Sequence, residues 1–202
     1  KISIIKGASS LKYAGDAVGG VIIAETSKEK LLDSIYGNVT TNLQSNGRGG
    51  GISTDYTKTH SSGWYYKFQG TLKRMGDFET PNYVMTNTGF SEHNVSLKAG
   101  LNRIDHGFDV YYSLFSNYLG ILRSSHAHTA IDIINAIENE VPHIIEDFSY
   151  DINIPRQKIN HHLIKFRGFK NFDFGKFSMK YDFQSNDRKE YDIRRGNRTK
   201  PA

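Results

Sequence analysis

Histidines are the residues of this 202-residue chain with the most evident capacity for chemistry. His126 and His128 stand two residues apart in a polar segment, and two imidazoles at that spacing can together contact a metal ion or a haem iron. Neither a carboxylate nor a third histidine joins them at ligand spacing, so a plain polar loop is the alternative. We treat both as candidate ligand-contact residues and expect no resident metal or cofactor.

Other chemistry-bearing patterns are weaker. His161 and His162 are adjacent at the start of an expected strand, where their rings point to opposite faces, so we expect an interfacial position and no shared metal. The absence of cysteine excludes disulfides, cysteine-based zinc sites and thiol nucleophiles. The glycine-rich segment from Lys1 to Thr26 lacks the Gly-Lys-Ser/Thr of a phosphate-binding loop. Since no nucleophile, base and orienting group occur at usable spacing, we expect no catalytic residues and a protein that is not an enzyme.

The composition indicates a β-rich chain and gives no sign of a nucleic-acid partner or a transmembrane helix. The net charge of +5, from 26 basic and 21 acidic residues, is too small to demand a nucleic-acid partner. The 12 Tyr and 12 Phe are typical of a β-rich chain. No apolar run of about 18 residues is present, so no transmembrane helix is expected, whereas a transmembrane barrel strand needs only about 9 to 11 alternating residues.

The segment from Lys1 to Thr26 predicts a compact unit built from two strands. Isoleucines favour the first strand, and Gly19 and Gly20 allow a tight bend into the second. Ser9 or Ser10 can cap a single helical turn between them. The expected strand, turn and strand cover residues 2–6, 8–13 and 21–26.

Seven later segments alternate apolar and polar residues with period two. One face is continuously apolar, whereas the other carries Lys, Arg, Asp and Gln at mid-strand and must therefore contact water. The pattern defines two faces without deciding which is inside. The expected strands cover residues 35–44, 52–57, 64–73, 94–102, 108–115, 164–167 and 176–184.

Connections between these strands alternate in length. Short turns fall on one edge, and Met75 to Glu92, Leu119 to Lys158 and the segment after Asp187 fall on the other, as in outer-membrane barrels. The longest connection contains the one helix we expect. Its apolar residues recur at helical spacing, with Thr129 placed to cap it and Pro142 to end it: Ala130, Ile133, Ile134, Ile137 and Val141. We expect this helix to cover the mouth of the sheet, with direct ligand contact as the alternative.

Several motifs near the N-terminal end occur in a fixed order. A strand ends in Lys6-Gly7, Leu11 and Tyr13 form a Leu-x-Tyr, and Gly-Gly-Val-Ile follows at residues 19–22. In this order the segment resembles the C-terminal end of the plug domain of TonB-dependent outer-membrane receptors. Ala8 stands where proline is usual in that family.

Later motifs look similar to the same family, particularly to its Bacteroidetes-type members. They are Asn-Thr-Gly at residues 87–89, the segment 126–142 and the segment 149–196. The resemblance implies an all-β chain that is a fragment of a plugged antiparallel transmembrane β-barrel, with a small α/β plug remnant. Residues 1–26 would be the C-terminal part of the plug, and residues 27–202 the first strands of the barrel with extracellular loops. Plugged transporters have about 22 strands, so we expect a fragment cut at both ends.

The resemblance also implies a function and a location. It implies active uptake of a scarce nutrient, such as a ferric siderophore, haem or another metal chelate, across the bacterial outer membrane. The implied partners are the TonB energy-transducing complex, whose contact segment would precede Lys1, an extracellular nutrient ligand, lipopolysaccharide and outer-membrane lipid, without nucleic acid. The alternative is a soluble β-rich carbohydrate-binding or adhesin module.

A basic cluster near the C-terminal end is expected at the outer rim of the barrel. Its members are Arg188, Lys189, Arg194, Arg195 and Arg198, together with Tyr191. Three roles are open to such a cluster: contact with lipopolysaccharide phosphates, binding of an anionic substrate, or plain solvation.

Overall fold

The computed structural model describes residues 2–12, 19–24, 32–125, 130–139, 141–142 and 144–192. It divides into two compact units, Lys1–Leu31 and Leu32–Ala202. Strands dominate the described residues and all the sheets are antiparallel, which confirms the prediction of an all-β chain.

The first unit pairs β1 (Ile2–Ile5) with β2 (Val21–Ala24) in antiparallel register. Between them, η1 (Gly7–Lys12) is a 3-10 helix. The serines do not cap it as expected, because the Ser9 hydroxyl donates to the Lys6 carbonyl at 3.1 Å and the Ser10 hydroxyl donates to the Gly7 carbonyl at 2.7 Å. Gly20 has φ +117°, and a Cβ there would lie 2.8 Å from the Ile5 carbonyl oxygen, so the bend requires glycine.

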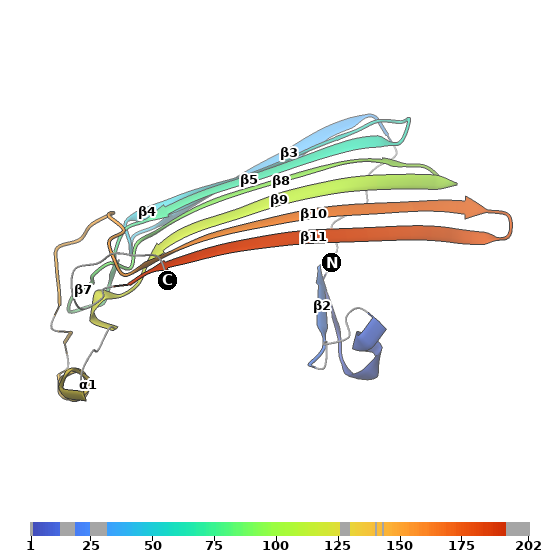
Figure 1. Cartoon of the computed structure of the whole chain (residues 1–202). Helices are drawn as coiled ribbons and strands as arrows, with labels where there is room; N and C mark the ends of the chain where they lie inside the picture. The colour runs from blue at the N-terminus through green and yellow to red at the C-terminus, as the bar shows by residue number, and fades with distance from the viewer. Residues whose placement is uncertain are drawn as a thin grey trace. The chain divides into compact units, whose positions relative to one another are not determined.

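The second unit is built on one seven-stranded sheet in which each strand neighbours the next in the chain (Figure 1). Its strands are β3 (Ser34–Gln44), β4 (Gly49–Thr59), β5 (Trp64–Met75), β8 (Phe90–Asn102), β9 (His106–Gly120), β10 (Arg156–Phe172) and β11 (Gly175–Tyr191). All seven expected segments are strands of this sheet. The sixth is much longer than its expected core of 164–167, because β10 pairs along its whole length with β9 and β11 even where alternation is interrupted by polar residues.

The two ends of this sheet differ. At the turn end, short connections at residues 60–63, 103–105 and 173–174 join the strands. At the loop end lie the tight turn at residues 45–48 and two long connections, 76–89 and 121–155. The first long connection contains β6 (Phe78–Glu79) paired with β7 (Val84–Met85), and the second contains η2 (Arg123–Ser125) and α1 (Ala130–Glu138).

Helix α1 begins where the sequence predicts, but it ends before Val141 and Pro142. The Asn139 side chain donates to the Asn135 carbonyl at 2.6 Å, and the Asn139 backbone N–H donates to the same oxygen at 3.0 Å. The Asn139 side chain therefore gives a second donor to a carbonyl that already accepts the last backbone hydrogen bond of the helix. Thr129, the expected cap, lies outside the described residues.

Cross-strand register keeps the two faces of the sheet chemically distinct. One row on the apolar face runs through Phe68, Leu97, Tyr112, Ile164 and Phe183. The adjacent row on the polar face runs through Lys67, Lys98, Tyr111, Lys165 and Asp182. Each of β5, β8, β9, β10 and β11 therefore contributes an apolar residue to the first row and a polar one to the second.

Burial shows which face is the more enclosed. On the apolar face, Leu97 is 49% exposed and Phe68 39% exposed, although both lie in inner strands. On the polar face, Tyr65 is 4% exposed and Thr57 is 6% exposed. At these positions the polar face is therefore the more enclosed of the two; the bend of the long strands is visible in Figure 1.

Two aspartates of the turn end have polar partners beside them. The Ser61 backbone N–H donates to Asp33 Oδ1 at 3.2 Å, and His60 Nδ1 lies 3.5 Å from the same oxygen. A side-chain hydrogen bond from Ser61, supported by its backbone N–H, holds the pKa of Asp33 below its usual value. A hydrogen bond from His106 lowers the pKa of Asp105 in the same way. The lowered pKa means that these contacts stabilise the fold above the ordinary aspartate pKa and are lost as the pH falls through the lowered one.

Replacing Ser61 with alanine is expected to raise the pKa of Asp33 toward its ordinary value, because the serine side chain is the largest cause of the shift. Ser62→Ala is the matched control, since its neighbouring hydroxyl does not act on Asp33. An NMR titration of the Asp33 carboxyl carbon measures both midpoints. Equal midpoints for Ser61→Ala and the unmodified chain would contradict the assignment.

Candidate functional site at the loop end of the sheet

Asp77 joins the two long connections at the loop end. It directly follows β5 and Gly76, is only 2% exposed, and accepts hydrogen bonds from the Thr88 N–H at 2.8 Å and the Gly89 N–H at 3.3 Å. Its second oxygen accepts from the Ser149 N–H at 3.3 Å, and its own N–H donates to the Ser149 carbonyl at 2.9 Å. Backbone donors thus stabilise a buried carboxylate and tie residues 76–89 to residues 144–155.

Asn87 makes a second bridge in the same region. Its amide nitrogen donates to the Pro155 carbonyl at 2.7 Å and the Ile121 carbonyl at 2.9 Å, while its amide oxygen accepts from the Asn153 N–H at 2.7 Å. Its φ of +65° is a conformation that asparagine tolerates better than most residues. One side chain, which lies just before β8, therefore bonds the residue that follows β9 and two residues that precede β10.

The turn at residues 45–48 contacts both long connections through Arg48. The Arg48 guanidinium lies 4.1 Å from the Phe148 ring centroid and forms an ion pair with Glu79. The Tyr150 hydroxyl donates to the Arg48 carbonyl, and Arg74 Nη2 donates to the Tyr150 carbonyl at 2.9 Å. Residues 45–48, 76–89 and 144–155 thus form one connected structure, which we call the loop platform.

A hollow of about 410 Å³ opens on the polar face next to the loop platform. The glycines of β4 leave room for it, since a Cβ at Gly51 would approach Lys73 Cγ to 2.7 Å. Hydrogen-bonding side chains and an apolar patch line it together: Asn42, Leu43, Gln44, Gly50, Gly51, Ser53, Lys73, Met75 and Phe90.

Within this polar-face hollow, the charged and hydroxyl groups are paired. Lys73 Nζ lies 2.9 Å from Glu92 Oε1, and the Ser53 and Thr71 hydroxyls are 2.9 Å apart. Carboxamides, a hydroxyl and an ammonium beside Phe90 and Met75 suit recognition of a polar solute with an apolar part. This lining favours reversible binding over covalent chemistry.

The predicted site residues occupy different places. His126 and His128 lie outside the described residues, between η2 and α1. His161 and His162 project to opposite faces of β10, and His162 Nδ1 lies 3.0 Å from the Tyr112 hydroxyl on the apolar face. Arg188 and Lys189 lie in β11 and pair with Glu190 at 2.7 Å and Asp187 at 3.4 Å, whereas Arg194, Arg195 and Arg198 lie outside the described residues.

The expected cover by α1 is not seen among the described residues. Ile133, Ile134 and Ile137 are 50%, 51% and 78% exposed, so the apolar stripe of this helix is open. In the described part of the chain, no three His, Cys, Asp or Glu side chains are grouped as metal ligands would be. None of the described helices is long and apolar enough to cross a membrane.

Comparisons with protein-family models, with characterised proteins and with solved structures found no match. The loop platform was not foreseen from sequence, although one signal was present. The Asn-Thr-Gly motif at residues 87–89 and the Ser149–Ile152 segment stood out as motifs, and both contribute partners to Asp77 or Asn87. The sequence does not show that they meet, because they are about 60 residues apart.

Replacing Asn87 with alanine is expected to destabilise the loop platform by about 1–3 kcal/mol, because buried backbone groups lose their partners. Asn82→Ala is the matched control, since Asn82 is exposed in the same connection and interacts through its backbone N–H. Limited proteolysis within residues 144–155 should accelerate for Asn87→Ala and not for Asn82→Ala. Equal cleavage rates for the two variants would contradict the bridging role of Asn87.

Proposed function

We propose that this chain is part of a TonB-dependent outer-membrane receptor, in which residues 1–26 end the plug and residues 27–202 form wall strands of the barrel. The supporting observation is the two-faced sheet: an exposed apolar face backed by a charged, more enclosed face. Exposed apolar patches larger than a few hundred Å² mark protein or membrane contacts.

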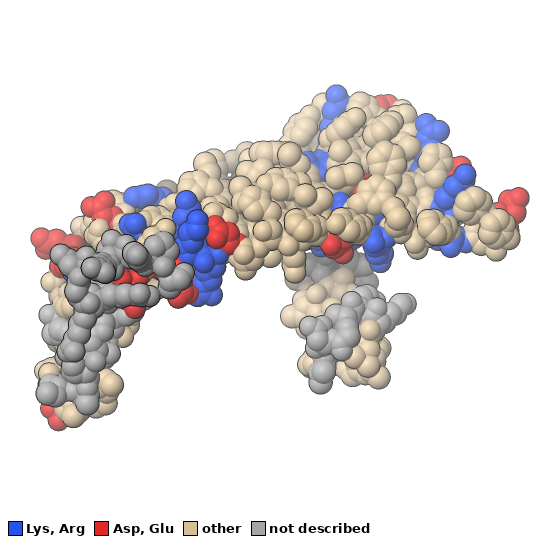
Figure 2. Space-filling model, in the orientation of Figure 1, with Lys and Arg blue, Asp and Glu red and all other residues tan. Residues whose placement is uncertain are grey.

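The uncharged band on the apolar face has the height of a bilayer. On β5 it runs from Trp64 to Leu72, and on β10 it extends between Lys158 and Lys170. On β4 one charge interrupts it, because Lys58 pairs with Tyr66 on this face. About nine residues at roughly 3.3 Å each span about 30 Å, against about 25 Å for the apolar band of a membrane barrel. In Figure 2 a mostly uncharged stretch separates the charged residues at the left end from those spread over the right half.

A soluble sandwich would cover this face with a second layer. Among the described residues the large buried apolar side chains are Tyr65, Met75 and Ile152, whereas apolar residues of all seven long strands are exposed. An exposed apolar face without a covering second layer is typical of a sheet that contacts lipid. This burial pattern disfavours the carbohydrate-binding or adhesin module as a soluble domain.

The edges of the sheet also favour a larger wall. Strands β3 and β11 lie at the two ends of the strand order and have free backbone edges among the described residues. Within a membrane such edges must be paired, and closure of a barrel with further strands pairs them. Short turns at one end and long connections at the other are typical of periplasmic turns and extracellular loops.

In this proposal the loop platform and the polar-face hollow serve ligand capture. The hollow lies on the inner face at the loop end, where an entering nutrient would first meet fixed hydrogen-bonding groups. Its lining suits a polar ligand with an apolar part, which includes ferric siderophores and other chelates as well as oligosaccharides. Energy would come from the TonB complex acting on the plug.

Replacing Leu97 with arginine is expected to lower the stability of the membrane-inserted protein by about 2–4 kcal/mol, because the charge enters lipid near mid-band. Ser96→Arg is the matched control: it is the adjacent residue of β8 and projects to the inner, polar face. Urea unfolding in lipid vesicles measures both variants. Equal destabilisation by the two arginines would contradict the outward orientation of the apolar face.

The transport function is tested by growth of a strain that lacks the gene. We expect a growth defect when one scarce nutrient is limiting, with iron supplied as siderophore or haem tested first and defined glycans second. Reintroducing the gene should restore growth. Normal growth under iron limitation would remove the iron ligands, and normal growth on the whole panel would contradict uptake.

A further inference from the structure

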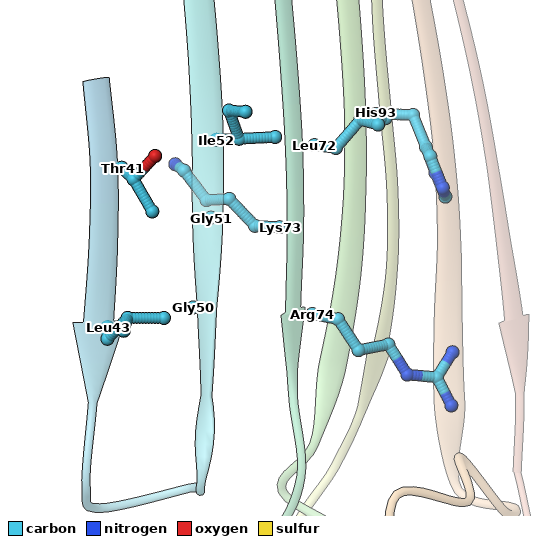
Figure 3. Close-up of a pocket in the computed structure, with 9 residues that line it drawn as sticks. All are labelled: Thr41, Leu43, Gly50, Gly51, Ile52, Leu72, Lys73, Arg74 and His93. Carbon is cyan, nitrogen blue, oxygen red and sulfur yellow. The ribbon is translucent and has the colours of Figure 1, made fainter. Parts of the chain in front are cut away.

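A second hollow, of about 330 Å³, lies on the apolar face at the loop end (Figure 3). Gly50 forms its floor, because it stands in register between Leu43 on β3 and Arg74 on β5. The next row, which runs through Thr41, Ile52, Leu72 and His93, bounds it on the side of the uncharged band. Its volume falls within the range of about 300–1,000 Å³ that is usual for small-molecule sites.

The walls of this glycine hollow are apolar. Leu43, Leu72 and Ile52 are 85%, 55% and 46% exposed, and in Figure 3 the Leu43 side chain reaches toward Gly50. A side chain at position 50 would meet the Asn42 carbonyl oxygen at 2.3 Å and Leu43 Cδ2 at 3.0 Å. Glycine therefore both keeps the floor open and allows the strands to pair closely.

One cation of this face, Arg74, borders the hollow on its loop side. In Figure 3 its side chain extends from β5 away from Gly50, and the same cross-strand row continues through Ser91 and Tyr118 to Lys158 and Lys189. Asp187, which pairs with Lys189 at 3.4 Å, is the acidic residue of the neighbouring row. Apolar surface thus meets a line of positive charge where the uncharged band ends.

Arg74 retains donors for a ligand. One nitrogen, Nη2, donates to the Tyr150 carbonyl at 2.9 Å, and a guanidinium has five N–H donors in all. The fork geometry of arginine suits a phosphate better than a single ammonium does. The hydrogen bond to Tyr150 places this side chain at the edge of the loop platform.

We propose that the glycine hollow binds one acyl chain of a phosphate-bearing membrane lipid, whose phosphate contacts the Arg74 guanidinium. The proposal rests on the proposed function, since it requires the apolar face to contact the bilayer. The chain lies over Gly50 between Leu43 and Leu72, and the headgroup lies at the level of the basic row. Binding at this point couples a lipid to the loop platform through the Arg74–Tyr150 contact.

The test uses the whole receptor that carries this chain, inserted into nanodiscs of phosphatidylcholine and phosphatidylglycerol with identical acyl chains. Native mass spectrometry after release counts the lipids that each variant retains. Thr41→Phe fills the hollow, and Val39→Phe adds the same bulk to the same face of β3 outside it. Arg74→Gln removes the charge, and Arg74→Lys keeps the charge without the fork.

The unmodified protein is expected to retain phosphatidylglycerol in preference to phosphatidylcholine, and Val39→Phe to behave in the same way. Thr41→Phe should lose the retained lipid. Arg74→Gln should lower the preference about fivefold, which corresponds to about 1 kcal/mol for one cation near an anionic surface, and Arg74→Lys should restore part of it. A merely structural role of Arg74 would not change headgroup preference.

Two results would overturn the proposal in different ways. If the protein enters the bilayer but Thr41→Phe and Val39→Phe retain equal lipid, or if Arg74→Gln keeps the full preference, the lipid site is wrong and the membrane assignment stands. If the unmodified protein does not enter the bilayer at all, the proposed function and the lipid site both fall.

Discussion

The antiparallel register of the long sheet is the constraint on which the rest of the structure depends. Because side chains alternate strictly, pairing Phe68 with Leu97 and Lys67 with Lys98 places a mostly apolar row on one face and a charged row on the other. A slip of one residue between β5 and β8 would place Lys98 or Ser96 beside Phe68. The assignments of the membrane face and of the two hollows depend on that separation of faces.

The loop end depends on a different kind of interaction. Asp77 and Asn87 are almost fully buried, yet their polar atoms are satisfied by backbone groups of segments that are distant in sequence. Satisfied buried polar groups specify one arrangement, because any displaced segment leaves donors or acceptors without partners. The long strands and the hydrogen bonds of Asp77 and Asn87 together hold the loop platform in one arrangement beside the two hollows.

The strands could be predicted from the sequence because the alternation of apolar and polar residues is a local signal. The apolar and polar faces can be assigned from the sequence of one strand alone at Trp64 to Lys73 and at Phe177 to Phe183. The spacing of isoleucines likewise predicts α1. The full length of β10 was missed, since Asn160, His161 and His162 interrupt the apolar pattern and only pairing with β9 and β11 extends the strand.

The site was harder to foresee than the fold. Asp77 and Asn87 act through contacts between segments far apart in the chain, and no periodic pattern encodes such contacts. The two hollows follow from glycines of β4 whose neighbours are known only once the register is known. Ser9 and Ser10 were expected as caps, but within a 3-10 turn their hydroxyls reach the carbonyls three residues earlier.

The orientation of the two faces is open to one direct measurement. Because the chain contains no cysteine, single cysteines can be placed at consecutive positions 95 to 99 of β8 and treated with a water-soluble maleimide in intact membranes. Cysteines at 96 and 98, on the inner polar face, should react, and those at 95, 97 and 99 should be protected by lipid. Equal labelling at all five positions would contradict the assignment of the apolar face to the bilayer.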